Sequence, residues 1–418
     1  MLRRSLLIMV PFLASMRAPS WADYNRWPWF LDITLNTSPS GADVAGDQAG
    51  FPLLVTLGSQ DAPIFAQAPS PASIRFSKPD GKPLPFQVES WDAAGRKACL
   101  WVGLDTLKGG RTDQKIRMYW GGDAADSSSG KAVFRAADGF QGVWHMDGGL
   151  ADASTNAIVA TDSGTASESE GRIGAARRFD NPEAYAATGK YIALGNPSAL
   201  NIAGRITLEA WIKWARRDGH RIVVCHGSAP PPATGAAFET VLRVGETKDY
   251  RAGVWTGTSH YAALDAPAAD SNAWVHLAGV YTGGAWLLYR NGVKVAETPA
   301  DTNGAKPSPG NWRIGAEYAS TVTRWFHGAI DEVRISGVAR PAEWIKASYE
   351  NQKSGQVMTV VGAPQVNGIK AVGLPSDRGT RPLLLIRRGQ ALFRSPTDME
   401  KTFSAMGGQK PPLPALLP

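Results

Sequence analysis

The sequence has little cysteine. Only Cys99 and Cys225 occur in 418 residues. Each lies in an apolar, strand-like run, and the two runs fall in different predicted domains. We therefore expect two buried free thiols rather than one disulfide. The two cysteines also lack the spacing of metal ligands, which excludes a cysteine zinc site.

Long hydrophobic runs are also missing. The apolar run at residues 6–14 is far shorter than the roughly 20 residues needed to span a bilayer. Arg3 and Arg4 precede it, and Ser20 and Ala22 place small residues where a signal peptidase cuts. These features predict a signal peptide over residues 1–22 and a periplasmic or secreted protein of the cell envelope. No later segment is predicted to cross a membrane.

An excess of one charge is absent from the body of the chain, although the whole chain carries +7. Residues 1–22 hold three arginines and no acids, and residues 363–418 hold eight basic and three acidic residues. Residues 23–362 therefore carry a net charge of −1. A near-neutral body does not predict nucleic-acid binding.

Helical periodicity is scarce, whereas turn residues and aromatics are plentiful, with 45 Gly, 29 Pro and 15 Trp. Short runs of β-branched and aromatic residues alternate with Gly, Pro and Asp, which predicts an all-β fold of two tandem β-sandwiches. We place the first at residues 23–140 and the second at 141–362, followed by a disordered basic tail at 363–418. Asn291-Gly292 predicts a hairpin turn, and Pro341 predicts the start of a short helix.

Segments of the second half resemble a laminin-G-like (concanavalin-A-like) jelly roll. They follow one another in the order expected for that family: residues 174–180, 191–194, 206–212, 274–281, 288–292, 326–335 and 344–352. The resemblance implies a jelly-roll sandwich, a fold that hosts glycan-binding modules as well as glucan hydrolases and lyases.

The first half resembles a bacterial family known as the domain of unknown function 2341. The segments that carry this resemblance are residues 74–76, 83–86, 89–91, 100–102, 116–121 and 134–145. That family commonly precedes a laminin-G-like domain and occurs beside ExbB/TolQ-type proton-channel proteins. The resemblance implies an envelope setting and one partner hypothesis, an accessory subunit of an ExbB/TolQ-type transport complex. It implies no chemistry.

Catalytic motifs are missing from the second half. Retaining glycoside hydrolysis needs two carboxylates about 5–5.5 Å apart. Asp331 and Glu332 are adjacent, so we expect them on opposite faces of a strand, and the other acids are scattered. The histidines lack metal-protease spacing, and no serine lies in a Gly-x-Ser-x-Gly elbow. We therefore expect a non-catalytic protein, with a glycoside hydrolase or polysaccharide lyase on the jelly-roll fold as the alternative.

Binding residues are predicted from exposed aromatics. The polar-aromatic stretch 255–261 contains Trp255, His260 and Tyr261, and it is poorly explained as core. Trp286 alternates with Leu287, so one of the two is expected to face solvent. We name Trp255, His260, Tyr261 and Trp286 as ligand-binding candidates. The expected ligand is a polysaccharide or an envelope protein.

A structural calcium ion is the one cofactor that the laminin-G-like resemblance implies. Asp180 and Asp331 are the acids in the segments that carry the resemblance, so they are the candidate ligands. The alternative for Asp331 is an ion pair with a basic residue such as Arg334. No other cofactor is expected.

Overall fold

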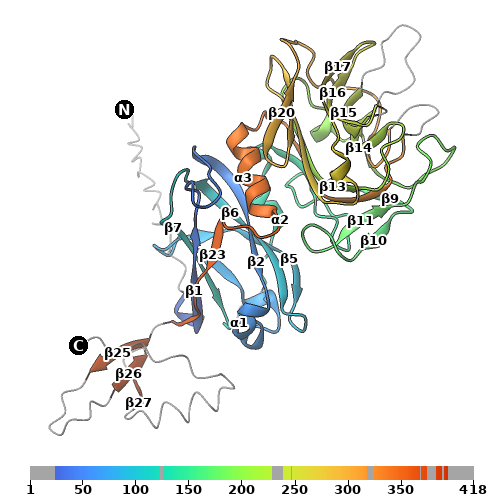
Figure 1. The fold of residues 1–418 in the computed structure, drawn as a ribbon. Coiled ribbons are helices and arrows are strands. Elements are labelled where there is room, and N and C mark those ends of the chain that lie inside the picture. Colours follow the sequence, from blue (N-terminus) through green and yellow to red (C-terminus); the bar gives the residue numbers. More distant parts are fainter. Residues whose placement is uncertain are drawn as a thin grey trace, which may run out of the picture.

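The computed structural model describes residues 24–122, 126–227, 239–245, 247–317, 324–367, 369–373, 383–387 and 390–393. Most of these residues form two β-sandwiches, with a helix, α3 (Ala342–Gln352), between them (Figure 1). The all-β fold class predicted from the sequence is confirmed. The predicted signal peptide lies outside the described residues.

The first sandwich pairs a six-stranded sheet with a three-stranded one. The larger sheet has the order β23-β1-β7-β3-β4, with β24 also on β1, and the smaller has the order β2-β6-β5. In β1, Leu31, Ile33 and Leu35 enter the core, and the residues between them face outward. The strands are β1 (Trp29–Leu35), β2 (Gln48–Leu57), β3 (Arg75–Ser77), β4 (Pro83–Leu84), β5 (Phe86–Asp92), β6 (Lys97–Leu107), β7 (Gln114–Trp120), β23 (Thr359–Val361) and β24 (Gln365–Val366).

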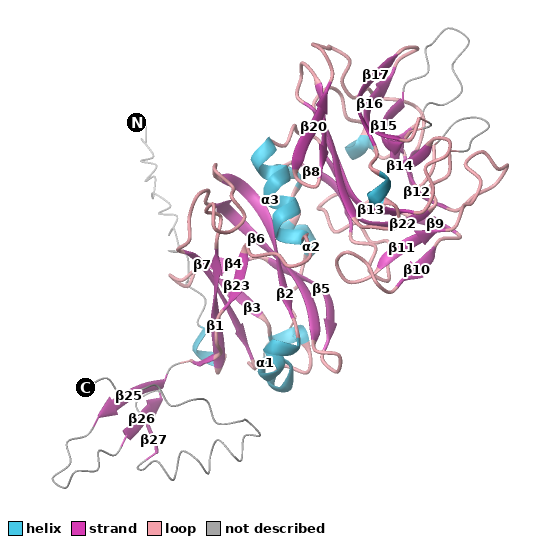
Figure 2. Ribbon diagram, viewed as in Figure 1, coloured by secondary structure: helices cyan, strands magenta, loops and turns pink. Residues whose placement is uncertain are grey.

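The second sandwich packs an eight-stranded sheet on a seven-stranded one (Figure 2). The eight-stranded sheet has the order β10-β11-β22-β13-β18-β19-β20, with β8 also on β22, and comprises β8 (Phe140–Trp144), β10 (Ala166–Glu168), β11 (Ala176–Phe179), β13 (Ile206–Trp214), β18 (Val275–Tyr281), β19 (Trp286–Arg290), β20 (Val293–Glu297) and β22 (Gly328–Ser336). The seven-stranded sheet has the order β17-β16-β15-β14-β21-β12-β9 and comprises β9 (Thr161–Ser163), β12 (Tyr191–Gly195), β14 (Arg221–His226), β15 (Glu239–Val244), β16 (Asp249–Trp255), β17 (Ser259–Asp265) and β21 (Trp312–Ile314).

Local sequence signals explain several element ends. Asn291 and Gly292 adopt positive φ values of 50° and 78° in the turn between β19 and β20, as predicted. Helix α3 begins directly after Pro341, also as predicted. Two shorter helices occur, α1 (Ala62–Gln67) and α2 (Gly130–Val133). None of the described helices is long and apolar enough to cross a membrane. Cys99 and Cys225 are free thiols, as expected.

The chain returns from the second sandwich to the first, so the predicted boundary at residue 362 is wrong. β8 opens the second sandwich and pairs with β22 there. β23 follows the second sandwich but pairs with β1 of the first. β23 and β24 cover β1, which would otherwise leave the unpaired backbone groups of an edge strand.

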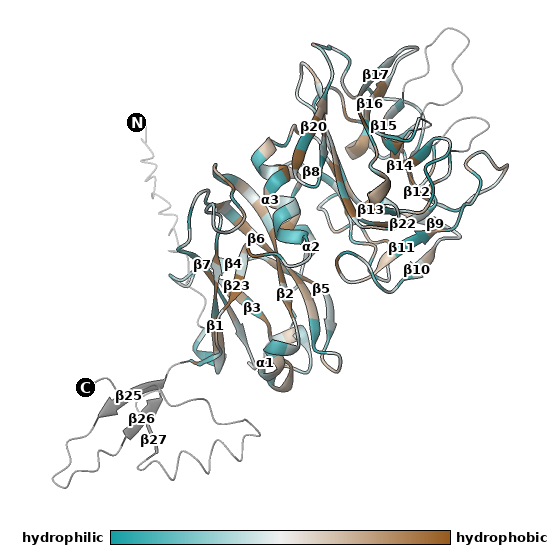
Figure 3. Ribbon diagram, in the orientation of Figure 1, coloured by the Kyte–Doolittle hydropathy of each residue, from teal (hydrophilic) through white to brown (hydrophobic). Residues whose placement is uncertain are grey.

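Helix α3 extends the core of the first sandwich toward the second. Trp344 and Ile345 of the helix belong to the same buried cluster as Phe51 of β2 and Ala278 of β18. Figure 3 shows hydrophobic residues concentrated along the strands of both sandwiches, with hydrophilic residues in the connecting loops. One hydrophobic cluster therefore spans both sandwiches at α3.

The tail that the sequence predicts to be disordered has described segments. Asn367 donates its backbone N–H to Pro28 and its side-chain amide to the carbonyl of Trp27, so residues 363–367 are attached to the first sandwich. Three further strands form a separate sheet: β25 (Ile369–Gly373), β26 (Leu383–Arg387) and β27 (Gln390–Phe393). The apolar run at 383–386 supplies the central strand. The other tail residues lie outside the described part of the chain.

We predict that β23 is needed for stability of the first sandwich. Truncation after Gln356 removes the β23 ladder and Met358, which is fully buried. The loss of this one side chain alone should cost about 3 kcal/mol of unfolding free energy. Urea denaturation measures this loss of unfolding free energy. Truncation after Asn367 is the control, because it keeps β23 and β24, and an equal stability of the two truncated proteins would contradict the prediction.

Candidate functional site

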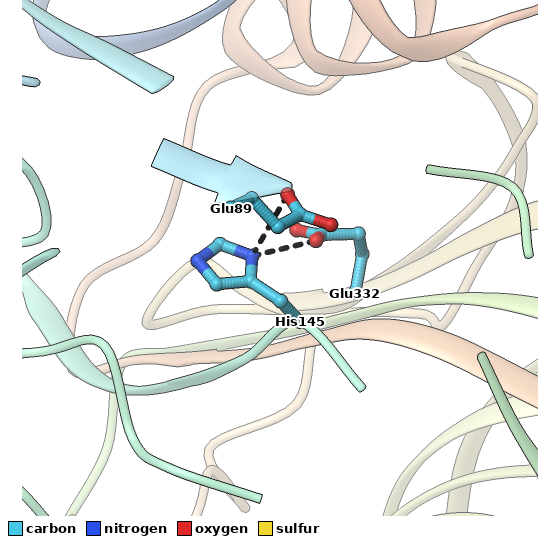
Figure 4. Close-up of side chains that lie close together, drawn as sticks. All are labelled: Glu89, His145 and Glu332. Carbon is cyan, nitrogen blue, oxygen red and sulfur yellow. Dashed lines mark hydrogen bonds and ion pairs between the residues drawn. The ribbon is translucent and has the colours of Figure 1, made fainter. Parts of the chain in front are cut away.

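Three ionisable side chains from distant segments meet at the junction of the sandwiches (Figure 4). Glu89 comes from β5, His145 directly follows β8 and Glu332 comes from β22. One ligand atom of each lies within 4.8 Å of the others. His145 Nδ1 is 2.6 Å from Glu332 Oε1 and 3.6 Å from Glu89 Oε2. The three side chains are only 2%, 8% and 1% exposed. We call this group the junction cluster.

A β-bulge in β22 turns Glu332 toward the junction. Asp331 and Arg334 pair with residues of β13 that are only two apart, so one extra residue is accommodated between them. Glu332 takes a left-handed φ of 50° there, and Val333 enters the core. The expectation that Asp331 and Glu332 point to opposite faces is wrong, because the bulge breaks the alternation on which it depends.

Neighbouring side chains hold each member of the junction cluster. Trp101 donates its indole N–H to Glu89 Oε2 over 2.5 Å. Arg334 Nη2 donates to Glu332 Oε2 over 2.8 Å. His145 Nε2 lies 3.1 Å from Gln87 Oε1. Glu89 Oε1, in contrast, is buried and has no hydrogen-bond partner among the described residues.

The junction cluster carries an excess of acids. Burial, and after it the charges of Glu332 and Asp331, raises the pKa of Glu89 well above its usual value. Burial alone would raise the pKa of Glu332 too, but the charges of His145 and Arg334 lower it. The arrangement concentrates negative charge where water is excluded, so it can hold a proton or a metal ion.

A second group lies on the outer face of the seven-stranded sheet. Trp255, at the end of β16, is 37% exposed. Tyr261 in β17 is half-buried beside Gly253, where an added Cβ would lie 2.7 Å from the tyrosine ring. The Arg243 guanidinium lies 4.7 Å from the ring centroid of Tyr261. The glycine thus allows an aromatic ring to lie close over the strand. We call Trp255 and Tyr261 the aromatic face.

The other two binding candidates do not belong to the aromatic face. His260 pairs with Val254, which is a core residue, so it lies on the inner side of the sheet, where its Nδ1 is 2.7 Å from Asp301 Oδ2. Trp286 is fully buried, and its indole N–H bonds to the carbonyl of Asn303. The prediction that Trp286 or Leu287 faces solvent is wrong, because Leu287 packs against the core cluster of the first sandwich.

The two predicted calcium ligands are not brought together. Asp331 is fully buried, and its carboxylate accepts backbone N–H groups from Arg172, Ile173 and Glu332. Asp180 is exposed, lies beyond the end of β11, and is 3.7 Å from His327. Along the ladder of β11 and β22 the two acids are four residues apart, or about 13 Å. They therefore do not form one calcium site. The alternative pairing of Asp331 with Arg334 is not seen either, since Arg334 pairs with Glu332.

Two glutamates, Glu239 and Glu317, also approach each other on the outer face of the seven-stranded sheet. Arg324 lies 3.2 Å from Glu239 and 3.0 Å from Glu317, so it bridges them. Burial, and after it the charge of Glu239, raises the pKa of Glu317 to about 7. A carboxyl group that titrates near neutrality can donate a proton in catalysis. The sequence reasoning missed this pair, because the two residues lie on different segments 78 positions apart.

The fold and these groups define a protein with two linked sandwiches, the second a jelly roll with a polar-aromatic outer face. Family models identify both parts. Residues 70–147 match the Domain of unknown function (DUF2341), and residues 186–346 match the Concanavalin A-like lectin/glucanases superfamily. The chain therefore carries these two regions in the order that the sequence resemblance predicts. None of the curated proteins matches it.

Several solved structures are similar to this chain at low sequence identity. Domain 4 of AbnA, an extracellular arabinanase from Geobacillus stearothermophilus in complex with arabinotriose, is 18% identical. The match covers 50% of this chain and 97% of that domain, with a TM-score of 0.37. The binding domain of Paraclostridial Mosquitocidal Protein 1 is 12% identical. The match covers 60% of this chain and 72% of that domain, with a TM-score of 0.40. A binding domain of botulinum neurotoxin DC in complex with SialylT is 9% identical, covering 51% of each chain with a TM-score of 0.37.

Proposed function

We propose that the protein is an exported, non-catalytic binding protein of the bacterial cell envelope that recognises a polysaccharide through its aromatic face. The observation that carries the proposal is the pairing of exposed Trp255 with Tyr261 on one side of neighbouring strands. Export and the envelope location rest on the predicted signal peptide. An ExbB/TolQ-type partner rests only on the resemblance of the first half.

The chemistry of the aromatic face suits sugar rings. A sugar presents a C–H face that packs on an aromatic ring and hydroxyls that need polar partners, as in other ligand sites where few polar groups fix the orientation. Trp255 and Tyr261 lie diagonally across β16 and β17, which places such residues about 7–8 Å apart. Arg243 and Arg251 lie within 4.7 and 6.0 Å of the Tyr261 ring centroid, so hydrogen-bond donors flank it.

Glycan-array binding followed by titration calorimetry tests the proposal. We expect Trp255→Ala and Tyr261→Ala each to weaken binding to the selected glycan at least tenfold, about 1.4 kcal/mol. Tyr185→Ala is the matched control, because Tyr185 is 53% exposed but lies outside the aromatic face. If the two variants bind as well as the wild type, or if the wild type binds no glycan, the proposal is wrong.

A hydrolase or lyase is the second candidate function, and the Glu239–Glu317 pair is the observation that favours it. If the protein cleaves a glycan, Glu317→Gln should abolish the release of reducing or unsaturated ends while leaving glycan binding intact. Asp180→Asn is the control, because Asp180 is exposed and lies 3.7 Å from His327, not in the glutamate pair. Binding without cleavage by the wild type would support the non-catalytic proposal.

A further inference from the structure

The junction cluster contains a carboxylate oxygen without a partner. The Glu89 side chain is 2% exposed, and its Oε1 has no hydrogen-bond partner among the described residues. Its Oε2 accepts one bond, from Trp101. Leaving a buried polar atom unpaired costs on the order of 1–3 kcal/mol, and more if the group is charged. The position therefore favours an added cation.

The contacts of His145 also favour an added cation between its ring and the carboxylates. Its Nδ1 faces Glu332 Oε1 and its Nε2 faces Gln87 Oε1, so both ring nitrogens face oxygen atoms. A neutral imidazole has only one N–H to donate. When Nε2 donates to Gln87, the Nδ1 lone pair points toward the two carboxylates, which is the tautomer that a metal ion requires. The space between Nδ1 and the carboxylates must then hold a positive charge.

The spacing of the donor atoms suits a transition metal. A tetrahedral zinc ion with bonds of about 2.0–2.2 Å holds its ligand atoms about 3.4 Å apart. The distances from His145 Nδ1 to the two carboxylates, 2.6 and 3.6 Å, lie on either side of this value. One imidazole and two carboxylates suit Zn²⁺ or Mn²⁺. Calcium is disfavoured, because it takes six to eight oxygen ligands.

Neighbouring side chains hold the donor atoms of the glutamates in place, as outer residues do in metal sites. Trp101 and Arg334 each bond to one oxygen of a glutamate and thereby fix its orientation. Gly174 packs closely against the cluster, where a larger residue would press on Glu89 and Asp147. An added Cβ there would lie 3.3 Å from Glu89 Oε1 and 2.7 Å from Asp147 Oδ2.

We propose that Glu89, His145 and Glu332 bind one divalent transition-metal ion that ties the two sandwiches together. Glu89 and His145 lie within the region matched at residues 70–147, whereas Glu332 lies within the region matched at 186–346. Bound metal would therefore crosslink the two regions at their junction. The site is separate from the aromatic face, so either proposal can fail without the other.

The test measures zinc binding by the full chain, free of any affinity tag and stripped with a chelator. We expect calorimetry and elemental analysis to give about one Zn²⁺ per chain, and Zn²⁺ to raise the thermal unfolding midpoint. Co²⁺ should give a visible absorption band of a protein-bound ion. A wild-type protein that is folded by circular dichroism but binds neither metal holds only a proton at the cluster, and this result would overturn the proposal.

Isosteric variants locate the site. Glu89→Gln and Glu332→Gln keep the shape of the side chains, and each should weaken zinc binding at least about 100-fold. The matched control is Glu209→Gln, because Glu209 is also buried and lies 3.4 Å from His276 Nε2, and this pair belongs to no group of three metal ligands among the described residues. The control should bind Zn²⁺ as the wild type does. Zinc binding that survives in Glu89→Gln, or that is lost in Glu209→Gln, would place the metal elsewhere and contradict the assignment.

Discussion

Replacing Arg334 by methionine should lower the free energy of unfolding by about 3–5 kcal/mol, measured by urea denaturation with a chelator present. The Arg334 side chain is 2% exposed, and its guanidinium donates to Glu332 Oε2 over 2.8 Å. Without it, the carboxylate of Glu332 keeps only the contact of its Oε1 with His145 among the side chains of the described residues, in a site that excludes water. Breaking a buried pair from one side leaves an uncompensated charge, which is why the expected loss is large.

A double-mutant cycle separates the lost ion pair from the lost packing. Arg334 also lies over Trp101, with 4.5 Å between its Cζ and the ring centroid, so methionine removes a stacked plane as well as a charge. Combining Arg334→Met with Glu332→Gln should recover a substantial part of the stability, because the buried charge is then absent. Additive losses in the cycle would show that the pair contributes nothing, and a loss below about 1 kcal/mol in Arg334→Met would contradict the prediction directly.

The elements that the sequence predicts well are those that local patterns determine. Alternating apolar residues in β1, the Asn291-Gly292 turn and the helix after Pro341 each depend on a few neighbouring residues. The order of the two regions was also predictable, because each carries several separated family segments. Backbone conformation and side-chain periodicity supply this information within a single element.

The junction was not predictable in the same way. Glu89 and His145 lie 56 residues apart, and Glu332 lies 187 residues beyond His145, so no spacing motif connects them. The available signal was weak: each residue falls within or beside a segment that carries a family resemblance. The bulge at Glu332 further reverses the expected direction of a side chain. Its one trace in the sequence is the three-residue spacing between the core residues Ile330 and Val333, where strict alternation gives two.

Contacts between the sandwiches explain the remaining differences between the sequence-based predictions and the structure. Leu287 was expected to be solvent-facing if Trp286 was not, but the outer face of its sheet packs against α3 and the first sandwich. Alternation along a strand identifies two faces, but it does not show whether a second domain covers the outer one. The return of β23 to β1 has the same origin, since pairing across more than 300 residues is set by the tertiary fold.

Replacing Trp344 by alanine should lower the free energy of unfolding by about 3–5 kcal/mol, because this side chain fills the space between the sandwiches. Trp344 is 2% exposed, and its ring centroid lies 5.1 Å from that of Phe51 and 6.1 Å from that of Phe140. The Arg340 guanidinium lies 4.0 Å from the same ring. Phe51 belongs to the first sandwich and Phe140 to a strand of the second, so the cavity would open at the contact that joins them.

The matched control for Trp344→Ala is Lys346→Ala in the same helix. Lys346 also connects α3 to the first sandwich, through a 2.7 Å ion pair with Asp43, but the two side chains are 30% and 61% exposed. An exposed pair contributes about 0–1 kcal/mol, so this variant should unfold almost as the wild type does. A single cooperative transition that shifts only for Trp344→Ala shows that buried area, not surface charge, couples the sandwiches. Two separate transitions in the wild type would instead show that they unfold independently, contrary to the shared core and the return of β23 to β1.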